Sequence, residues 1–227
     1  MLEIIYQDEW IVAINKPHGL LVHKTLIAND ASEFAVQLLR DQLNQFVYPV
    51  HRLDRKTSGV LLFALDTEVN SLLQQAFMNG EVQKTYLAFV RGYTEPKGTI
   101  DYPLKNEKGK IQQALTHFKN IQSFEMAVSQ GKHQSSRYSL VEIQPETGRM
   151  HQIRKHFAHI DHPIIGDRPH GCNKQNKLFL ERWGMNTMLL HASEIQFEHP
   201  VSKMMVNVKA ELKEEFQRIL NMVGYSS

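Results

Sequence analysis

Apolar residues that alternate with polar ones, or that form short β-branched runs, recur along the chain and predict strands. These runs are Leu2–Tyr6, Trp10–Asn15, Val47–Arg52, Gly59–Leu65, Gln83–Gly92, Leu115–Ile121, Ser136–Ile143, Met188–Phe197 and Val201–Val208. Helical spacing predicts helices over Ala31–Phe46, Thr67–Met78 and Glu211–Met222, with Thr67 as the N-cap and Gly80 as the stop of the second. A fourth predicted helix opens at Thr147 and buries a stripe of Met150, Ile153, Phe157 and Ile160.

The order of these elements indicates the fold class. Strands outnumber helices, and several strands follow one another with no helix between them. This order argues against a doubly wound parallel sheet and predicts an α+β fold, a mixed and mostly antiparallel sheet with helices packed on it. The segment Thr94–Gly109 is predicted to be a loop inside one domain, so residues 1–227 are expected to form a single domain.

Composition excludes several classes of protein. At 42% hydrophobic and 22% charged residues, the chain can bury a core and is not a disordered tail. Its apolar runs are too short to cross a bilayer, and its first ten residues are acidic where a secretory signal is basic. The single cysteine, Cys172, cannot form an internal disulfide, which suits a reducing compartment, so a cytoplasmic location is expected.

Charge is uneven along a chain that is nearly neutral as a whole. Lys and Arg number 26 against 24 Asp and Glu. Residues 149–182 nevertheless carry basic residues at 149, 154, 155, 168, 174, 177 and 182, and acidic ones only at 161, 167 and 181. A local cationic surface suits an anionic partner such as nucleic acid, although a solvated helix face has the same pattern.

No motif for a metal or a cofactor is present. HExxH, CxxC and EF-hand spacings are missing despite twelve histidines, and so are the phosphate-binding GxxxxGK[ST] and GxGxxG loops. The GxSxG elbow of serine hydrolases is also missing. We therefore expect neither a metal nor a cofactor.

Residues 47–66, VYPVHRLDRKTSGVLLFALD, place a charged segment between two apolar runs. Asp54 lies there with Arg52 and Arg55 close in sequence, and such cations keep a carboxylate ionised. Two interpretations are open from these residues alone. The segment is either a salt-bridged loop that positions two strands, or it carries a carboxylate that acts as nucleophile or base.

HRLDRKTSG at 51–59 resembles the catalytic motif of the RluA family of RNA pseudouridine synthases. Three further signatures resemble that family and follow in its order: NKP with Gly19 at 15–19, KTYLA with Gly92 at 84–92, and TGRMHQIR at 147–154. The last continues through HPIIGD at 162–167 and closes with LHA at 190–192, so the resemblance spans nearly the whole chain.

The resemblance implies a mixed sheet with a central catalytic cleft, and an isomerase that converts uridine in RNA to pseudouridine. The chain starts almost directly at the catalytic fold, with no room for the N-terminal S4-type RNA-binding domain of many relatives. The segment 166–185 is most similar to members of the family that modify tRNA, which implies tRNA as partner and uridine 65 in the T stem as target. A ribosomal RNA uridine is the alternative substrate.

The resemblance also implies roles for individual residues. Asp54 is the expected nucleophile or base, Tyr86 stacks on the uracil, and Arg154 pairs with Asp54, with Arg149 as the alternative partner. Arg52 fills the gap left by the extruded base, contacts a phosphate, or forms a structural ion pair. The basic residues expected to bind RNA are Arg52, Arg149, Lys155, Lys174 and Lys177. Asn15 and Lys16 either shape a loop or face the RNA.

Two other functions compete with this interpretation. A non-catalytic RNA-binding module would use the 149–182 segment, but it has no reason to place the Asp54 carboxylate against a phosphate backbone. A glycoside or nucleoside hydrolase would need a second carboxylate near Asp54, and the motif supplies none.

Overall fold

The computed structural model describes residues 1–23, 33–129 and 134–225, and the chain divides into two compact units. Unit 1 comprises Met1–Lys84 with Ala192–Lys213, and unit 2 comprises Thr85–His191 with Glu214–Ser227. The divisions fall inside β5 (Gln83–Arg91) and β11 (Leu190–Glu198) and just before α5 (Glu214–Met222). Each unit has a buried core of its own.

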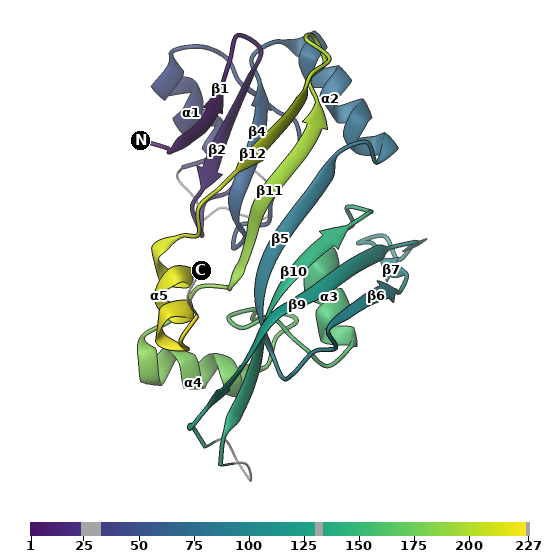
Figure 1. Ribbon diagram of the computed structural model, residues 1–227. Helices are drawn as coiled ribbons and strands as arrows, with labels where there is room; N and C mark the ends of the chain where they lie inside the picture. Colours follow the sequence, from purple (N-terminus) through teal and green to yellow (C-terminus); the bar gives the residue numbers. More distant parts are fainter. Residues whose placement is uncertain (24–32, 130–133, 226–227) are drawn as a thin grey trace. The chain divides into compact units, whose positions relative to one another are not determined.

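In unit 1, β1 (Ile4–Gln7), β2 (Ile11–Lys16), β4 (Ser58–Ala64) and β11 are neighbours in that order (Figure 1). Two more strands join them: β3 (Tyr48–Pro49) pairs with β4, and β12 (Met205–Lys209) pairs with β11. The pairings β1–β2, β2–β4, β3–β4 and β11–β12 are antiparallel. The helices of the unit are α1 (Ala35–Leu43) and α2 (Thr67–Asn79), and α2 packs into the core through Val69 and Leu73.

In unit 2, β5, β10 (Ser136–Pro145), β9 (Leu115–Met126) and β6 (Lys97–Asp101) are antiparallel neighbours in that order. A separate short hairpin consists of β7 (Leu104–Lys105) and β8 (Ile111–Gln112). Helix α3 (Gln152–His159) packs through Ile153 and Phe157 on the face that carries Val90 and Ile143.

Helix α4 (Asn173–Trp183) packs on the opposite face of these strands, because Phe179 contacts Phe89 and Tyr138, whose side chains alternate with those facing α3. Helix α5 buries Phe216, Ile219 and Leu220. Among the described residues no helix is long and apolar enough to span a membrane.

The mixed, mostly antiparallel α+β class predicted from the sequence is confirmed. Helix α2 begins and ends as expected, and Gly80 ends it at φ 77°. The N-cap, however, is Asp66 rather than Thr67, because the Asp66 carboxylate accepts hydrogen bonds from the N–H groups of Glu68 and Val69. The predicted helix 31–46 is shorter, since α1 covers Ala35–Leu43 and residues 31–32 lie outside the described part.

Other predictions were wrong in detail. Only Tyr48–Pro49 of the strand predicted over Val47–Arg52 pairs with a neighbour. The Thr94–Gly109 segment, predicted as a loop, contains β6 and β7. Helix α3 starts at Gln152 instead of Thr147, which leaves Met150 exposed. Helix α4 was not predicted, because its buried residues are Gln175 and Phe179 and no apolar stripe marks it.

Candidate active site

Asp54 lies in the segment between β3 and β4 of unit 1 and is half-buried. Its carbonyl oxygen accepts a hydrogen bond of 3.0 Å from the Thr57 N–H, which closes a turn directly after the carboxylate. Beyond the turn, Gly59 has φ +107°, and a Cβ atom there would lie 2.1 Å from the Ala192 carbonyl oxygen. Only glycine therefore lets the chain pass from the Asp54 turn into β4 beside β11.

Lys16 explains why the NKPxG and HRLDRxTSG motifs belong together. Its side chain is fully buried, and the Nζ atom donates to the carbonyl oxygens of Pro17 (3.0 Å), Leu20 (2.9 Å) and Arg55 (3.2 Å). Gly19 reinforces this link, because its N–H donates to the Arg55 carbonyl at 2.8 Å. Burial lowers the pKa of Lys16 to about 7, and the Asp54 carboxylate opposes the shift. Lys16 is thus a loop-shaping residue rather than one that faces the RNA.

Asn15, its neighbour, has the same kind of role. It is 2% exposed, and its side-chain amide donates to the Glu211 carbonyl oxygen at 2.9 Å. The side chain therefore fixes the end of β2 to the chain that follows β12.

His51 is the first residue of the HRLDRKTSG motif, and its side chain contacts both β4 and α2. The His51 Nε2 atom accepts a hydrogen bond of 3.1 Å from the Leu62 N–H, and the ring stacks on Phe77 with centroids 4.8 Å apart. Removal from water, together with the Lys84 ammonium, lowers the pKa of His51 to about 3. The imidazole is therefore neutral at physiological pH and positions the loop instead of carrying charge. Arg52, next to it, is exposed.

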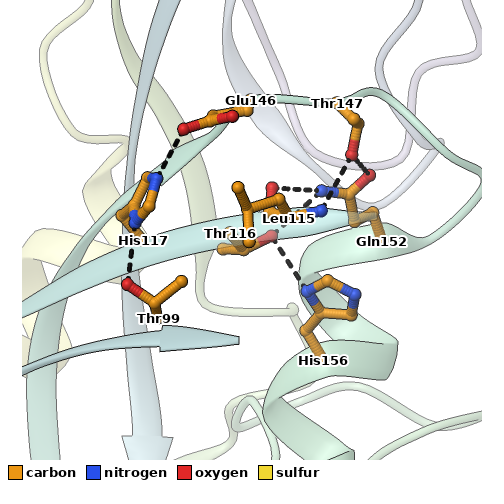
Figure 2. Close-up of polar contacts among 8 residues, drawn as sticks. All are labelled: Thr99, Leu115, Thr116, His117, Glu146, Thr147, Gln152 and His156. Atoms are coloured by element: carbon orange, nitrogen blue, oxygen red, sulfur yellow. Dashed lines mark hydrogen bonds and ion pairs between the residues drawn. The ribbon is translucent and has the colours of Figure 1, made fainter. Parts of the chain in front are cut away.

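In unit 2 the TGRMHQIR motif is organised by Gln152, the first residue of α3 (Figure 2). The Gln152 side-chain oxygen accepts from the Thr147 hydroxyl at 2.7 Å and from the Arg149 N–H at 3.0 Å. Its amide nitrogen donates to the Leu115 carbonyl and to the Thr116 hydroxyl, both at 3.0 Å. One buried amide thus fixes the backbone that carries Arg149 to the neighbouring strand β9.

Arg154 and Asp167 form a buried bidentate ion pair. The Arg154 Nε and Nη2 atoms each lie 2.8 Å from a different carboxylate oxygen of Asp167. The two side chains are only 5% and 1% exposed. Paired donors and acceptors of this kind fix the plane of the guanidinium as well as its position. The sequence suggested Arg154 as a site residue but did not suggest Asp167 as its partner.

The backbone next to Asp167 is fixed by the side chain of Asn176 and by a close approach at Gly171. The Asn176 side chain accepts from the Gly166 N–H at 2.8 Å and donates to the Asp167 carbonyl oxygen at 2.7 Å. A Cβ atom at Gly171 would lie 1.8 Å from the Asp167 carbonyl oxygen, so only glycine fits where the chain folds back past Asp167. The rings of His151 and His170 contact each other at 3.0 Å and join this loop to the start of α3.

The remaining predicted residues differ in their surroundings. Tyr86 lies on β5, opposite Ile143 of β10, and packs against the core of unit 2 while staying half-exposed. Asp54 belongs to unit 1, whereas Tyr86 and Arg154 belong to unit 2. Their meeting in one active site stays a prediction.

The residues predicted to bind RNA are also placed by the structure. Arg149 is half-buried, and its Nε atom donates to the Gln113 carbonyl oxygen at 3.0 Å. Lys155 is half-buried on α3, and Lys174 and Lys177 are exposed on α4. The Lys177 ammonium lies 3.6 Å from the Glu181 carboxylate, which partly neutralises it.

Across residues 1–23, 33–129 and 134–225, no three His, Cys, Asp or Glu side chains are grouped so that they could hold a metal ion.

Comparison with known proteins places these motifs in a family. Residues 10–159 match the family model described as RNA pseudouridylate synthase. The protein described as tRNA pseudouridine synthase C of Vibrio cholerae is 45% identical over 99% of this chain and 97% of its own length. The protein of the same description from Haemophilus influenzae is 43% identical over the full length of both.

Solved structures give the same result for the fold. The structure described as human RNA pseudouridylate synthase domain containing 4 has a TM-score of 0.73 and 25% identity, over 97% of this chain and 92% of that one. A second human structure, of domain containing 1, also has a TM-score of 0.73 but is 21% identical, so it shows the fold alone.

Proposed function

The chain belongs to the RNA pseudouridylate synthase family, and from this we propose that it isomerises uridine to pseudouridine in tRNA, at position 65 in the T stem. The observation that carries the tRNA substrate is the 45% identity to a protein described as tRNA pseudouridine synthase C, over 99% of this chain. The arrangement around Asp54 and Arg154 supports the same chemistry, because buried side chains hold the loops of both residues.

The reaction rearranges bonds without gaining or losing atoms. The bond between N1 of uracil and C1′ of the ribose breaks, the base turns, and C5 bonds to C1′. The hydrogen on C5 is lost and N1 gains one, so the product is an isomer of the substrate. A base inside a helix must first leave the stack, as for other enzymes that act on a nucleobase.

In this proposal Asp54 acts in its ionised form, as the nucleophile or the base. Lys16 holds the carbonyl of the adjacent Arg55, so the carboxylate stands on a fixed backbone. Tyr86 presents a flat ring for stacking on the uracil, and its hydroxyl assists loss of the C5 proton.

Arg154 keeps the Asp54 carboxylate charged. A guanidinium has five N–H donors, so its bidentate pair with Asp167 is compatible with a second carboxylate partner. Arg149, the alternative partner, has its Nε atom engaged by the Gln113 carbonyl. We therefore assign Arg149 to RNA binding, together with Lys155, Lys174 and Lys177, while Arg52 occupies the space that the extruded base leaves.

The test of this function is a competition between substrates. Unmodified tRNA and a fragment of large-subunit ribosomal RNA are offered together to the full-length protein, and pseudouridine is mapped in both. The proposal predicts modification at uridine 65 of the tRNA. Modification confined to the ribosomal fragment would discard the tRNA substrate, and modification at another tRNA position would discard the T-stem target alone.

A further inference from the structure

We propose that the β7–β8 hairpin, residues 104–112, is a binding surface for the phosphate backbone of the RNA substrate, with Lys105, Lys108 and Lys110 as its contacts. This inference rests on the proposed function, since it takes tRNA as the ligand. It extends the RNA-binding surface beyond residues 149–182, where the charge pattern of the sequence placed it.

The turn of the hairpin is held by hydrogen bonds among its own residues. The Asn106 N–H donates to the Lys110 carbonyl at 3.0 Å, and the Gly109 N–H donates to the Asn106 carbonyl at 2.9 Å. The Asn106 side-chain oxygen accepts from the N–H groups of Lys108 and Lys110, at 3.0 and 2.9 Å. Gly109 supplies the left-handed conformation of the turn, with φ +78°. These hydrogen bonds define the conformation of the backbone that carries the lysines.

The three lysines face solvent without a neutralising partner. Leu104 is buried and directs one side of the hairpin to the protein, so Lys105 and the directly opposed Ile111 lie on the exposed side. Lys108 and Lys110 are exposed as well. Among the described residues, no carboxylate lies within the 4.0 Å of an ion pair from any of these three ammonium groups.

Three other lysines of the chain, in contrast, each have a carboxylate partner. Lys203, Lys209 and Lys213 lie 3.7, 3.5 and 2.6 Å from the carboxylates of their partners. Those partners are Glu198, Glu194 and Glu3. The hairpin has a single acid, Glu107, so its nine residues have a net charge of +2. A polyanion gains most from cations that no carboxylate already neutralises.

One end of the hairpin contacts α3, which carries Arg154, and the other contacts Arg149 in the segment before that helix. Before the hairpin, the Tyr102 ring stacks on His159 with centroids 3.6 Å apart, and the Tyr102 carbonyl contacts His156 at 3.0 Å. After it, the Gln113 carbonyl accepts from Arg149. The hairpin thus keeps a fixed place within unit 2 relative to α3. Phosphates bound by its lysines would hold the RNA in register with the residues that we assign to the reaction.

The experiment replaces the three lysines together, as Lys105→Ala, Lys108→Ala and Lys110→Ala, and measures tRNA affinity between 50 and 200 mM salt. Each lost phosphate contact reduces the slope of log affinity against log salt by about 0.7–0.9. The slope should therefore fall by about 2–3. Over this fourfold change in salt, the parent should lose about 20- to 40-fold more affinity than the variant. A matched control removes the same charge through Lys203→Ala, Lys209→Ala and Lys213→Ala, and should keep nearly the parent slope.

Equal slopes for the hairpin variant and the parent would overturn the proposal, as would an equal fall in the control. Thermal unfolding of both variants checks that the fold persists. Pseudouridine formation in tRNA is measured in parallel with the parent protein. Absence of product with the parent would discard the proposed function, while the binding slopes still decide whether the hairpin contacts RNA.

Discussion

Replacing Lys16 with methionine should both destabilise unit 1 and slow the reaction. Methionine fills a similar volume but cannot donate to the carbonyl oxygens of Pro17, Leu20 and Arg55, which the ammonium contacts at 2.9–3.2 Å. The carbonyl of Arg55 would keep its bond from the Gly19 N–H but lose the one from the Lys16 ammonium. The turn that presents Asp54 begins one residue earlier, and it would lose the hydrogen bond that ties it to Lys16.

The expected loss of stability is the difference between the hydrogen bonds that are lost and the cost of burying the ammonium, which is avoided. Below about pH 7, where the Lys16 ammonium is charged, each hydrogen bond from it contributes about 1.5–3 kcal/mol, so the three together contribute roughly 5–9 kcal/mol. Burying the ammonium costs several kcal/mol, which methionine avoids, and water reaches part of the freed carbonyls. The net loss is then about 2–3 kcal/mol. For a chain of this length that lowers the unfolding temperature by about 4–12 °C. Displacing a reacting group by about 1 Å costs up to about 100-fold in rate.

Thermal unfolding and single-turnover pseudouridine formation at saturating tRNA measure the two effects. The matched control is Lys209→Met, because Lys209 is exposed and its pair with Glu194 should contribute less than about 1 kcal/mol. The reasoning is refuted if Lys16→Met unfolds and turns over like the control. A variant that is destabilised but keeps the parent rate would refute only the link from Lys16 to Asp54.

Three further predictions concern single residues. Asp167→Asn should break the buried bidentate ion pair with the Arg154 guanidinium, costing about 3 kcal/mol and lowering the single-turnover rate as Arg154→Ala does; an unchanged unfolding temperature would contradict this. Gly59→Ala should cost about 3 kcal/mol or more, because the new Cβ would lie 2.1 Å from a backbone oxygen at φ +107°; recovery of soluble, parent-like protein would contradict it. Burial of Asp8 opposes its ionisation, but its hydrogen bonds outweigh burial and lower the pKa of the carboxyl below its usual value. That stabilisation is present above the unfolded pKa and is lost as pH falls through the folded one, so in urea unfolding at pH 2–5 Asp8→Asn should lose less stability on acidification than the parent.

Sequence patterns predicted the fully buried strands well, because a short continuous apolar run is typical of a strand that is buried on both faces. The runs at Trp10–Asn15 and Gly59–Leu65 became β2 and β4 with only small shifts of their ends. Helix α4 was missed because its buried residues are Gln175 and Phe179, and the rest of its first turns are polar, so no apolar stripe marks it. The Thr94–Gly109 segment was taken as a loop because proline, glycine and lysine dominate it, and they conceal two short strands.

Motif residues of the site were identifiable, but their physical partners were not. A lysine is rarely buried, so the hydrogen bonds of Lys16 to a loop 39 residues away could not be inferred from its position. Asp167 stood among basic residues as one of few acids in residues 149–182, and this was the signal that could have suggested a partner for Arg154. Nothing in the spacing of the two showed which carboxylate the guanidinium would hold.

The most direct test of the account is the rate of pseudouridine formation by Asp54→Asn. The substitution removes the charge and keeps the shape, and it leaves in place the backbone hydrogen bond from the Thr57 N–H to the carbonyl of residue 54. Single-turnover kinetics on unmodified tRNA, with binding and thermal unfolding measured on the same samples, separate chemistry from affinity and folding. The account predicts that the rate falls by at least about 1,000-fold while affinity and unfolding temperature stay close to those of the parent. A rate within tenfold of the parent would contradict the assignment of Asp54 to the reaction.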